Sequence, residues 1–272
     1  MSNDYVHGTH PGEQRRLADL NALVNRASLA ALAPGAGETF LDVGSGLGQF
    51  ARDVARVTRA RTLGIERSEE QLARARALAR EAGEDPLVEF RQGDALALPL
   101  GEGEIGGFDC AHARFVLEHL RDPGAAVAGM ARAVRPGGRV VLEDDDHEQL
   151  RLWPEPPCVS AVWRAYVRTY DRLGHDPIVG RRLVQLLSSA GLEPRRIELL
   201  PFGACSGQPS FIPFVSNLAD IFRGARETIL ETGGVSAGEF DAALAGLESF
   251  ARRADAAFWY TICWAEGTRP PA

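Results

Sequence analysis

An acidic residue and three alternate glycines occur together in the stretch Asp42-Val43-Gly44-Ser45-Gly46-Leu47-Gly48. An apolar run, Phe40–Val43, leads into this stretch and a helical pattern follows it, so we expect a tight turn between a buried strand and a helix. Glycine leaves no Cβ between the backbone and a ligand, and the first N–H groups of a helix carry partial positive charge. The stretch therefore predicts a nucleotide-like ligand at the edge of a parallel sheet.

The spacing of the glycines narrows the class of ligand. Gly44, Gly46 and Gly48 form G-x-G-x-G, whereas dinucleotide folds use G-x-G-x-x-G and phosphate loops use G-x-x-x-x-G-K. Asp42 stands two residues before the first glycine, where it would repel a pyrophosphate and attract an ammonium group. A cofactor with an amino-acid end is therefore favoured.

Two further acids follow predicted strands. Thr62–Glu66 is a mostly apolar run that ends in Glu66, 18 residues after Gly48 (66 − 48). A carboxylate at the tip of the second parallel strand can accept hydrogen bonds from both hydroxyls of a ribose. Asp94 follows the predicted strand Val88–Arg91, and it can accept a hydrogen bond from an exocyclic amine such as that of adenine.

Candidate general bases lie further along the chain, namely His119, His147 and the acids Asp144 and Asp145. A positioned histidine or carboxylate can remove a proton from an acceptor. For each of them a structural role, such as an acid at a helix start, is the alternative. An aromatic-rich stretch follows, which we expect to form an apolar acceptor pocket. Its candidate residues are Trp153, Trp163 and Tyr166.

Alternating strands and helices must position these residues. From about residue 40 to residue 146 the chain alternates between strand and helix patterns, which predicts an α/β fold with a parallel, doubly wound sheet. We expect a single domain over residues 1–272. Its parts are a helical lid at 1–35, a cofactor-binding core at 36–146, a helical cap at 147–178, and the rest of the sheet at 179–272 with a helical insertion at 208–253.

Capping and turn signals set several boundaries. Ser68 is a good N-cap for a helix over Glu69–Glu81, and Ser236 with Glu239 forms a capping-box pattern that opens another helix. Pro136-Gly137-Gly138 predicts a helix stop and a turn before a strand over Val140–Glu143.

Composition excludes several classes of function. The 272 residues are 45% hydrophobic and 25% charged, as in ordinary globular proteins, and the net charge of −7 provides no basic field for nucleic acid or anionic membrane. All 30 basic residues are arginine, so a lysine Schiff base is impossible. The four cysteines form no C-x-x-C pair, and no signal peptide or run of 18 apolar residues occurs. We expect a cytoplasmic protein with free thiols.

The motifs together resemble the class I S-adenosylmethionine-dependent methyltransferases. The resemblance covers about residues 38–145 and rests on five motifs in the family's order. It implies a Rossmann-like sheet of seven strands in the order 3-2-1-4-5-7-6, with strand 7 antiparallel and placed at Phe258–Ala265. The motifs are Leu41 to Gly48, Glu66, Gly93-Asp94-Ala95, Phe108-Asp109 leading to Leu117-Glu118-His119-Leu120, and Arg135 to Val140.

The resemblance also implies how S-adenosylmethionine, and its product S-adenosylhomocysteine, would be bound. Gly44, Ser45, Gly46 and Gly48 would pass close to the methionine part, with Asp42 near its amino group. Glu66 would hold the ribose, Arg67 would flank the adenine, and Gly93, Asp94 and Ala95 would contact the adenine edge. Arg114 would face the methionine carboxylate, and Tyr5 and Arg16 would reach the same carboxylate when the lid closes.

The expected reaction is methyl transfer to an oxygen or nitrogen atom of a small-molecule acceptor, by positioning with or without a general base. No nucleic acid or membrane partner is expected, and a homodimer is compatible with the sequence. No metal is expected either, because metal-dependent relatives supply an aspartate just after strand four and Ala111–Phe115 contains no acid. The alternatives are a cofactor-binding regulatory or assembly protein without transfer activity and a nicotinamide-dependent oxidoreductase.

Overall fold

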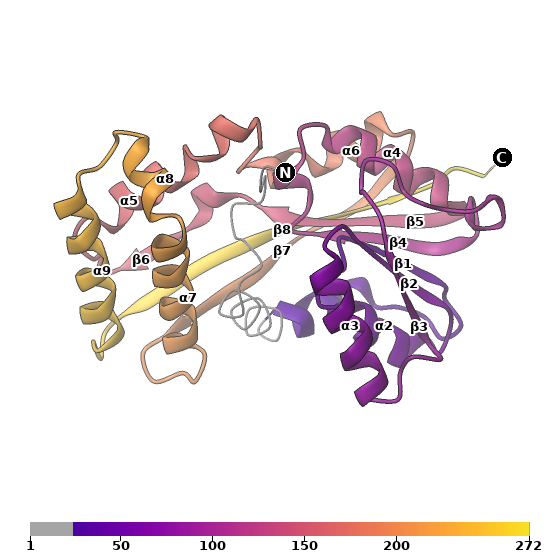
Figure 1. Ribbon diagram of the computed structural model, residues 1–272, viewed down its shortest axis with the longest axis horizontal. Helices are drawn as coiled ribbons and strands as arrows, with labels where there is room; N and C mark the ends of the chain where they lie inside the picture. Colours follow the sequence, from indigo (N-terminus) through magenta and orange to yellow (C-terminus); the bar gives the residue numbers. More distant parts are fainter. Residues whose placement is uncertain (1–23, 272) are drawn as a thin grey trace.

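The computed structural model describes residues 24–271, and a twisted sheet with helices on both faces runs through them (Figure 1). The first half of the sheet consists of β1 (Phe40–Val43), β2 (Thr62–Glu66), β3 (Val88–Gln92), β4 (Phe108–Arg114) and β5 (Val134–Asp145). The helices α2 (Gln49–Thr58), α3 (Glu69–Glu81) and α4 (Pro123–Ala133) alternate with these strands, except that a loop with the short 3-10 helix η1 (Glu102–Glu104) joins β3 to β4.

The second half of the chain is more elaborate. It contains η3 (His147–Gln149), β6 (Arg151–Trp153), α5 (Val159–Val167), η4 (Tyr170–Leu173), η5 (Val179–Arg182), α6 (Leu183–Ser189), β7 (Glu193–Cys205), α7 (Phe211–Gly224), α8 (Arg226–Glu231), α9 (Ala237–Ala251) and β8 (Ala257–Thr268).

The strand order confirms the predicted topology. The strands lie in the order β3-β2-β1-β4-β5-β8, with β7 on the outer side of β8, so β7 and β8 are the sixth and seventh strands of the predicted sheet. Strands β1 to β5 are parallel, and β8 is antiparallel to β5. The sheet has one strand more than predicted, because β8 is long enough to pair with β5 through Ile262–Thr268 and with the short β6 through Ala257–Trp259.

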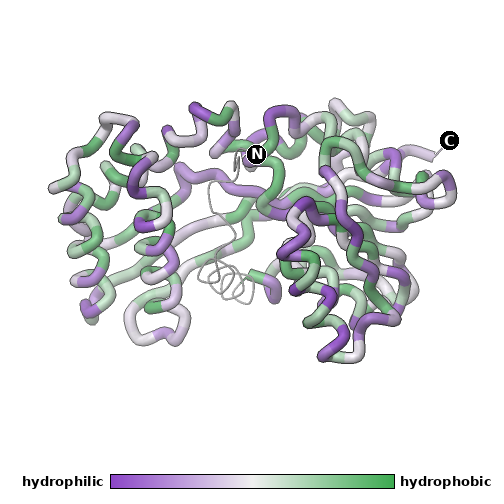
Figure 2. Tube along the Cα trace, viewed as in Figure 1, coloured by the Kyte–Doolittle hydropathy of each residue, from purple (hydrophilic) through white to green (hydrophobic). Residues whose placement is uncertain are grey.

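Helices cover the two faces of the parallel strands separately. Helices α2 and α3 pack on one face against β1, β2 and β3, whereas α4 and α6 lie on the other face against β4, β5 and β8 (Figure 1). Hydrophobic and hydrophilic segments alternate along these helices in Figure 2, as in amphipathic helices whose apolar side faces a sheet. The all-buried strand β1 fits a position between two covered faces.

A group of helices, α5, α7, α8 and α9, packs around the far end of the β7–β8 pair, and we call it the helical lobe (Figure 1). The apolar side chains of this lobe form one continuous cluster with Phe40, Phe50 and Val54 of the parallel part. The lobe and the parallel part of the sheet therefore share a core.

The capping predictions are confirmed, but two strand boundaries are wrong. The Ser68 side chain accepts from the Gln71 N–H, and Ser236 and Glu239 form the reciprocal capping box. Strand β5 begins at Val134 and passes through the Pro-Gly-Gly segment, where the register with β4 shifts and Gly137 has φ +77°. The sequence also predicts a strand over Arg196–Leu200, but β7 extends beyond this range at both ends through its pairing with β8.

No helix among residues 24–271 is both long enough and apolar enough to cross a membrane.

Candidate functional site

The carboxyl ends of the parallel strands meet at one edge of the sheet, and a cleft of about 350 Å³ opens there. This volume is within the range of ligand pockets. Most of the residues that the sequence assigned to a cofactor line the cleft, together with His119. These residues are Asp42, Gly44, Ser45, Gly46, Glu66, Arg67, Gly93, Asp94, Ala95 and Arg114.

The glycine turn adopts the conformation that its sequence predicts. Gly44, Gly46 and Gly48 all have positive φ, at 74°, 53° and 71°. Gly48, however, is absent from the residues that line the cleft. A Cβ placed on Gly48 would lie 2.2 Å from Cζ of Phe90. The structure thus gives Gly48 a packing role against Phe90.

Glu66 connects the second strand to the glycine turn. Its Oε2 accepts a hydrogen bond from the Gly46 N–H at 3.0 Å, and its Oε1 accepts one from the Ser68 N–H at 2.8 Å. Asp94 is held in a similar way, because its Oδ1 accepts from the Leu96 N–H at 2.9 Å. Both carboxylates are therefore fixed by backbone donors while they line the cleft, as a preorganised binding site requires.

A buried network of charges forms the floor of the cleft. His112 on β4 lies between Asp42 and Glu143, with Nδ1 at 2.9 Å from Asp42 Oδ1 and Nε2 at 3.3 Å from Glu143 Oε1. Burial alone lowers the pKa of His112, but hydrogen bonds to the two carboxylates outweigh it and raise the pKa. Ser28 donates to Glu143 at 2.7 Å. The network holds Asp42 in place from below.

Sequence reasoning missed this network. Asp42 is the direct partner of His112 in the register of β1 and β4. On β5 the direct partner of His112 is Val141, and Glu143 lies two residues further along that strand. The available signal was a histidine inside the otherwise apolar stretch from Cys110 to Ala113. A buried ionisable residue in such a strand needs a charged partner on a neighbouring strand.

Arg114 joins the cleft to the helix over residues 24–32. Its guanidinium donates to Ser28 Oγ at 3.2 Å and to Asn25 Oδ1 at 2.8 Å, and it lies 4.8 Å from the ring centroid of Phe50. The helix is therefore anchored beside the cleft, where the sequence analysis placed a lid. Tyr5 and Arg16, which were also assigned to the cofactor, lie outside the described residues.

Two unsatisfied polar atoms support a polar ligand in the cleft. Within residues 24–271, Ser45 Oγ and Gln49 Oε1 are buried without a hydrogen-bond partner, and both residues line the cleft. Buried polar atoms cost free energy unless they are paired. The lining residues therefore fit a ligand that carries amino, carboxyl and hydroxyl groups.

Comparison with known proteins decides the family. The family described as "Methyltransferase domain" matches residues 41–142, which include the glycine turn, the carboxyl ends of β1 to β4 and most of β5. The 27-O-demethylrifamycin SV methyltransferase of Amycolatopsis mediterranei is 30% identical over 245 residues, which cover 90% of this chain and 83% of that protein. The chain belongs to the class I S-adenosylmethionine-dependent methyltransferase family.

Other relatives of this methyltransferase differ in how much of their length it covers. An uncharacterized 37.1 kDa protein of a Streptomyces fradiae transposon is 37% identical over 161 residues. This alignment covers 57% of this chain but only 43% of that protein, so the chain spans less than half of that relative's length. The crystal structure of the [4+2]-cyclase SpnF aligns with a TM-score of 0.55 and 25% identity, and the alignment covers 96% of this chain and 82% of that one. Family membership argues against the nicotinamide-dependent alternative.

Of the candidate bases of the methyltransferase, His119 is the one that lines the cleft. Burial, and then the charges of His175 and His147, lower the pKa of His119 to about 3. The imidazole is therefore neutral at pH 7, so it can donate or accept a hydrogen bond but binds a proton weakly. Its Nε2 lies 3.3 Å from Glu118 Oε1.

His147 and Asp145 lie behind the cleft in a buried polar cluster. Burial, and then the charge of Glu118, raise the pKa of Asp145 to about 8, and burial raises the pKa of Glu118 to about 8 as well. Asp144 has a structural role, because its carboxylate accepts from the N–H groups of Val116, Leu117 and Asp145. Direct contact with a reacting atom in the cleft is therefore expected only for His119.

The three aromatic residues predicted to form an acceptor pocket do not line the cleft. Trp153 lies on β6 with 67% of its surface exposed, because its strand pairs at the end of β8. Trp163 and Tyr166 are buried on α5, where they contact each other and His147. Trp163 and Tyr166 therefore belong to the core that the helical lobe shares with the parallel part of the sheet.

Proposed function

We propose that this methyltransferase transfers the methyl group of S-adenosylmethionine to an oxygen or nitrogen atom of a small-molecule acceptor. The observation that carries the proposal is the convergence of the glycine turn, Glu66 and Asp94 on one cleft that also includes His119. A cofactor bound by these groups would have its methyl group within the same cleft as a polar side chain suited to an acceptor.

The cleft residues have separate roles in this proposal. Glu66 accepts from the ribose hydroxyls, since each carboxylate oxygen has lone pairs beyond the one used by the backbone. Asp94 accepts from the adenine amine, and Arg67 flanks the ring. The Gly44–Gly46 backbone passes along the methionine part, with Asp42 near the ammonium group and Arg114 near the carboxylate.

The cofactor supplies an already activated methyl group, so the protein's task is to align the acceptor and exclude water. Hydrogen bonds from Arg114, which lines the cleft, hold the helix over residues 24–32 next to it. His119 positions the acceptor by a hydrogen bond, and its low pKa makes positioning a better role than full proton removal. Small-molecule oxygen acceptors are supported by the name of the Amycolatopsis relative, which refers to an O-demethylated rifamycin.

Calorimetry with S-adenosylmethionine and S-adenosylhomocysteine tests the cofactor site. Wild-type protein should bind both, and Glu66→Gln should weaken binding roughly tenfold or more, because hydrogen bonds to a charged group contribute about 1.5–3 kcal/mol. Glu70→Gln is a control at a carboxylate in the first turn of α3, outside the residues that line the cleft. If neither ligand binds to folded wild-type protein, the proposal is wrong.

A second candidate is a cofactor-binding protein without methyl transfer. The observation that favours it is the alignment with SpnF, which is named a cyclase and not a methyltransferase. Incubation with a panel of phenols, amines and carboxylic acids, followed by mass spectrometry, separates the two. A product heavier by one methylene group supports transfer, whereas cofactor binding with no methylated product from any panel member supports the second candidate.

A further inference from the structure

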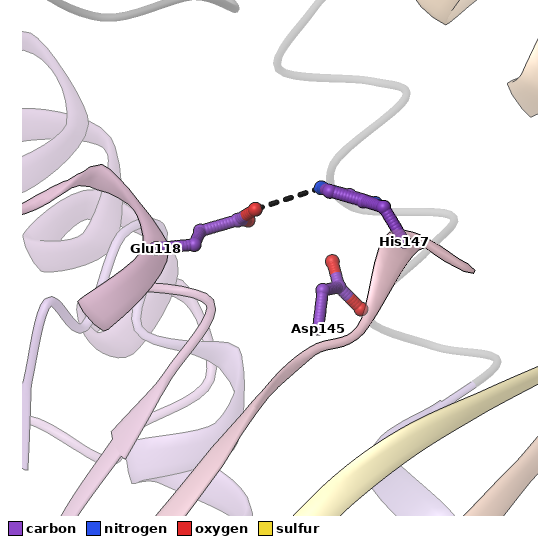
Figure 3. A group of neighbouring side chains, drawn as sticks. All are labelled: Glu118, Asp145 and His147. Atoms are coloured by element: carbon purple, nitrogen blue, oxygen red, sulfur yellow. Dashed lines mark hydrogen bonds and ion pairs between the residues drawn. The ribbon is translucent and has the colours of Figure 1, made fainter. Parts of the chain in front are cut away.

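Three buried side chains behind the cleft point toward a common space (Figure 3). Glu118 comes from η2 (Leu117–His119), which follows β4, Asp145 is the last residue of β5, and His147 opens η3. One ligand atom from each, two carboxylate oxygens and an imidazole nitrogen, lie within 4.8 Å of one another. Metal–ligand bonds of 2.0–2.2 Å would bring such atoms about 3–4 Å apart, so small rotations of the side chains suffice.

The hydrogen bonds around His147 match those of a metal-bound histidine. Its Nε2 faces Glu118 Oε2 at 2.8 Å and lies 3.2 Å from the hydroxyl of Tyr170, while its Nδ1 lies 3.1 Å from the hydroxyl of Tyr260. Metal-ligating histidines characteristically use one nitrogen for the metal and the other for an oriented polar partner. The indole of Trp163 also donates to the His147 carbonyl at 2.6 Å, which fixes the backbone.

Asp145 supplies an independent observation. Its Oδ1 is buried and has no hydrogen-bond partner within residues 24–271. A buried carboxylate oxygen without a partner is costly. Figure 3 shows the Asp145 carboxylate below the Glu118–His147 pair, with one oxygen turned toward it, so a cation placed among the three would contact this carboxylate.

The balance of charge favours a divalent ion. Glu118 is paired with the imidazoles of His119 and His147, and these provide no permanent positive charge. Metal binding releases any proton held by the two acids, and the resulting two carboxylates, with one neutral imidazole, neutralise a charge of 2+. Carboxylates suit Mg²⁺ and Mn²⁺, whereas imidazole suits Zn²⁺, Fe²⁺ and Ni²⁺, so a mixed set favours a divalent transition metal.

We propose that Glu118, Asp145 and His147 bind a divalent transition-metal ion of the Mn²⁺, Fe²⁺, Co²⁺ or Zn²⁺ class. No metal was expected from the sequence because Ala111–Phe115 has no acid, but the fold brings Glu118 of η2 close to the end of β5. Three protein ligands leave positions open for an oxygen ligand. The metal site does not rest on the proposed function.

Titration of the full chain with Mn²⁺ tests the site directly. After treatment with a chelator, the protein is titrated with MnCl₂ and free Mn²⁺ is followed by electron paramagnetic resonance, with no methyl donor or acceptor present. Wild-type protein should bind one equivalent. Asp145→Asn should weaken binding by about 100-fold or more, since even changes in residues that support ligands cost 10–100-fold. The matched control is Glu148→Gln, an exposed carboxylate in the same short helix, which should leave binding unchanged.

The spectrum of the bound ion provides a second readout. Pulsed measurements on the Mn²⁺ complex should show coupling to an imidazole nitrogen, and His147→Gln should remove it. Absence of stoichiometric binding in wild-type protein would overturn the proposal. So would equal affinity in wild type, Asp145→Asn and His147→Gln. Because the titration contains no cofactor, its failure is separate from failure of the proposed methyl transfer.

Discussion

Replacement of Gly48 by alanine tests the packing role that the structure assigns to this glycine. The new Cβ would lie 2.2 Å from Cζ and 2.5 Å from Cε1 of Phe90, and 3.2 Å from the Cβ of Ala75. Phe90 cannot retreat easily, because it is buried in a cluster with Leu72 and Ala75. The residue would also have to keep φ near +71°.

The expected cost has two parts. Alanine in the left-handed region costs about 1–2 kcal/mol, and insertion of a methyl group into a packed core costs about 1–3 kcal/mol. Gly83 separates the two parts, since it has φ +66° but no atom within 4 Å of an added Cβ. Gly83→Ala should therefore cost about 1–2 kcal/mol, and Gly48→Ala should cost about 1–3 kcal/mol more.

Urea unfolding of both variants measures this difference, which corresponds to a melting temperature lower by roughly 2–12 °C. In a Phe90→Leu background the clash is removed, so the penalty of Gly48→Ala should fall to that of Gly83→Ala. Equal destabilisation by the two alanines in the wild-type background would refute the packing argument. Cofactor affinity of the folded Gly48→Ala protein should change little, since Gly48 does not line the cleft.

Three further predictions address other parts of the molecule. Ser236→Ala removes the capping box of α9 and should lower the free energy of unfolding by about 1 kcal/mol, whereas an unchanged urea midpoint would contradict the cap. The hydrogen bond from Arg91 lowers the pKa of Glu104 to about 2, from 4.5. Its carboxylate therefore stabilises the fold above pH 4.5, and this stabilisation is lost as the pH falls toward 2. Glu104→Gln should be less stable than wild type by up to about 1 kcal/mol at pH 7. The urea midpoints of the variant and the wild type should converge in acid. The exposed Cys205 should react with a thiol reagent in the native protein. Cys110 is buried, which raises the pKa of its thiol, so it should react only after denaturation. Equal reaction rates of the two thiols in the native protein would contradict this burial.

The parallel part of the fold could be predicted because its signals are local. The glycine turn, Glu66 and Asp94 each follow directly from an apolar run, and parallel strands bring their carboxyl ends to one edge regardless of the details of packing. The apolar run Phe258–Ala265 indicated a strand, whereas the antiparallel direction of β8 was implied only by the family resemblance.

The remaining features depend on contacts between distant segments. The pairing of His112 with Asp42 and Glu143 requires the register of three strands, and no spacing within one strand contains it. Trp153 is exposed because β6 pairs at the end of β8, whereas Trp163 is buried because α5 packs into the helical lobe. A pattern of aromatic residues indicates burial, but it does not distinguish a core from the wall of a pocket.

The position of β8 also has a consequence for synthesis on the ribosome. Strands β5 and β7 both pair with β8, yet β8 begins 52 residues after β7 ends (257 − 205). At a translation rate of 5–20 residues per second, synthesis of β8 begins roughly 3–10 s after synthesis of β7 ends. During that interval two open strand edges are accessible to other nascent chains, so co-translational chaperones should matter more for this protein than for one whose strands pair in the order of synthesis.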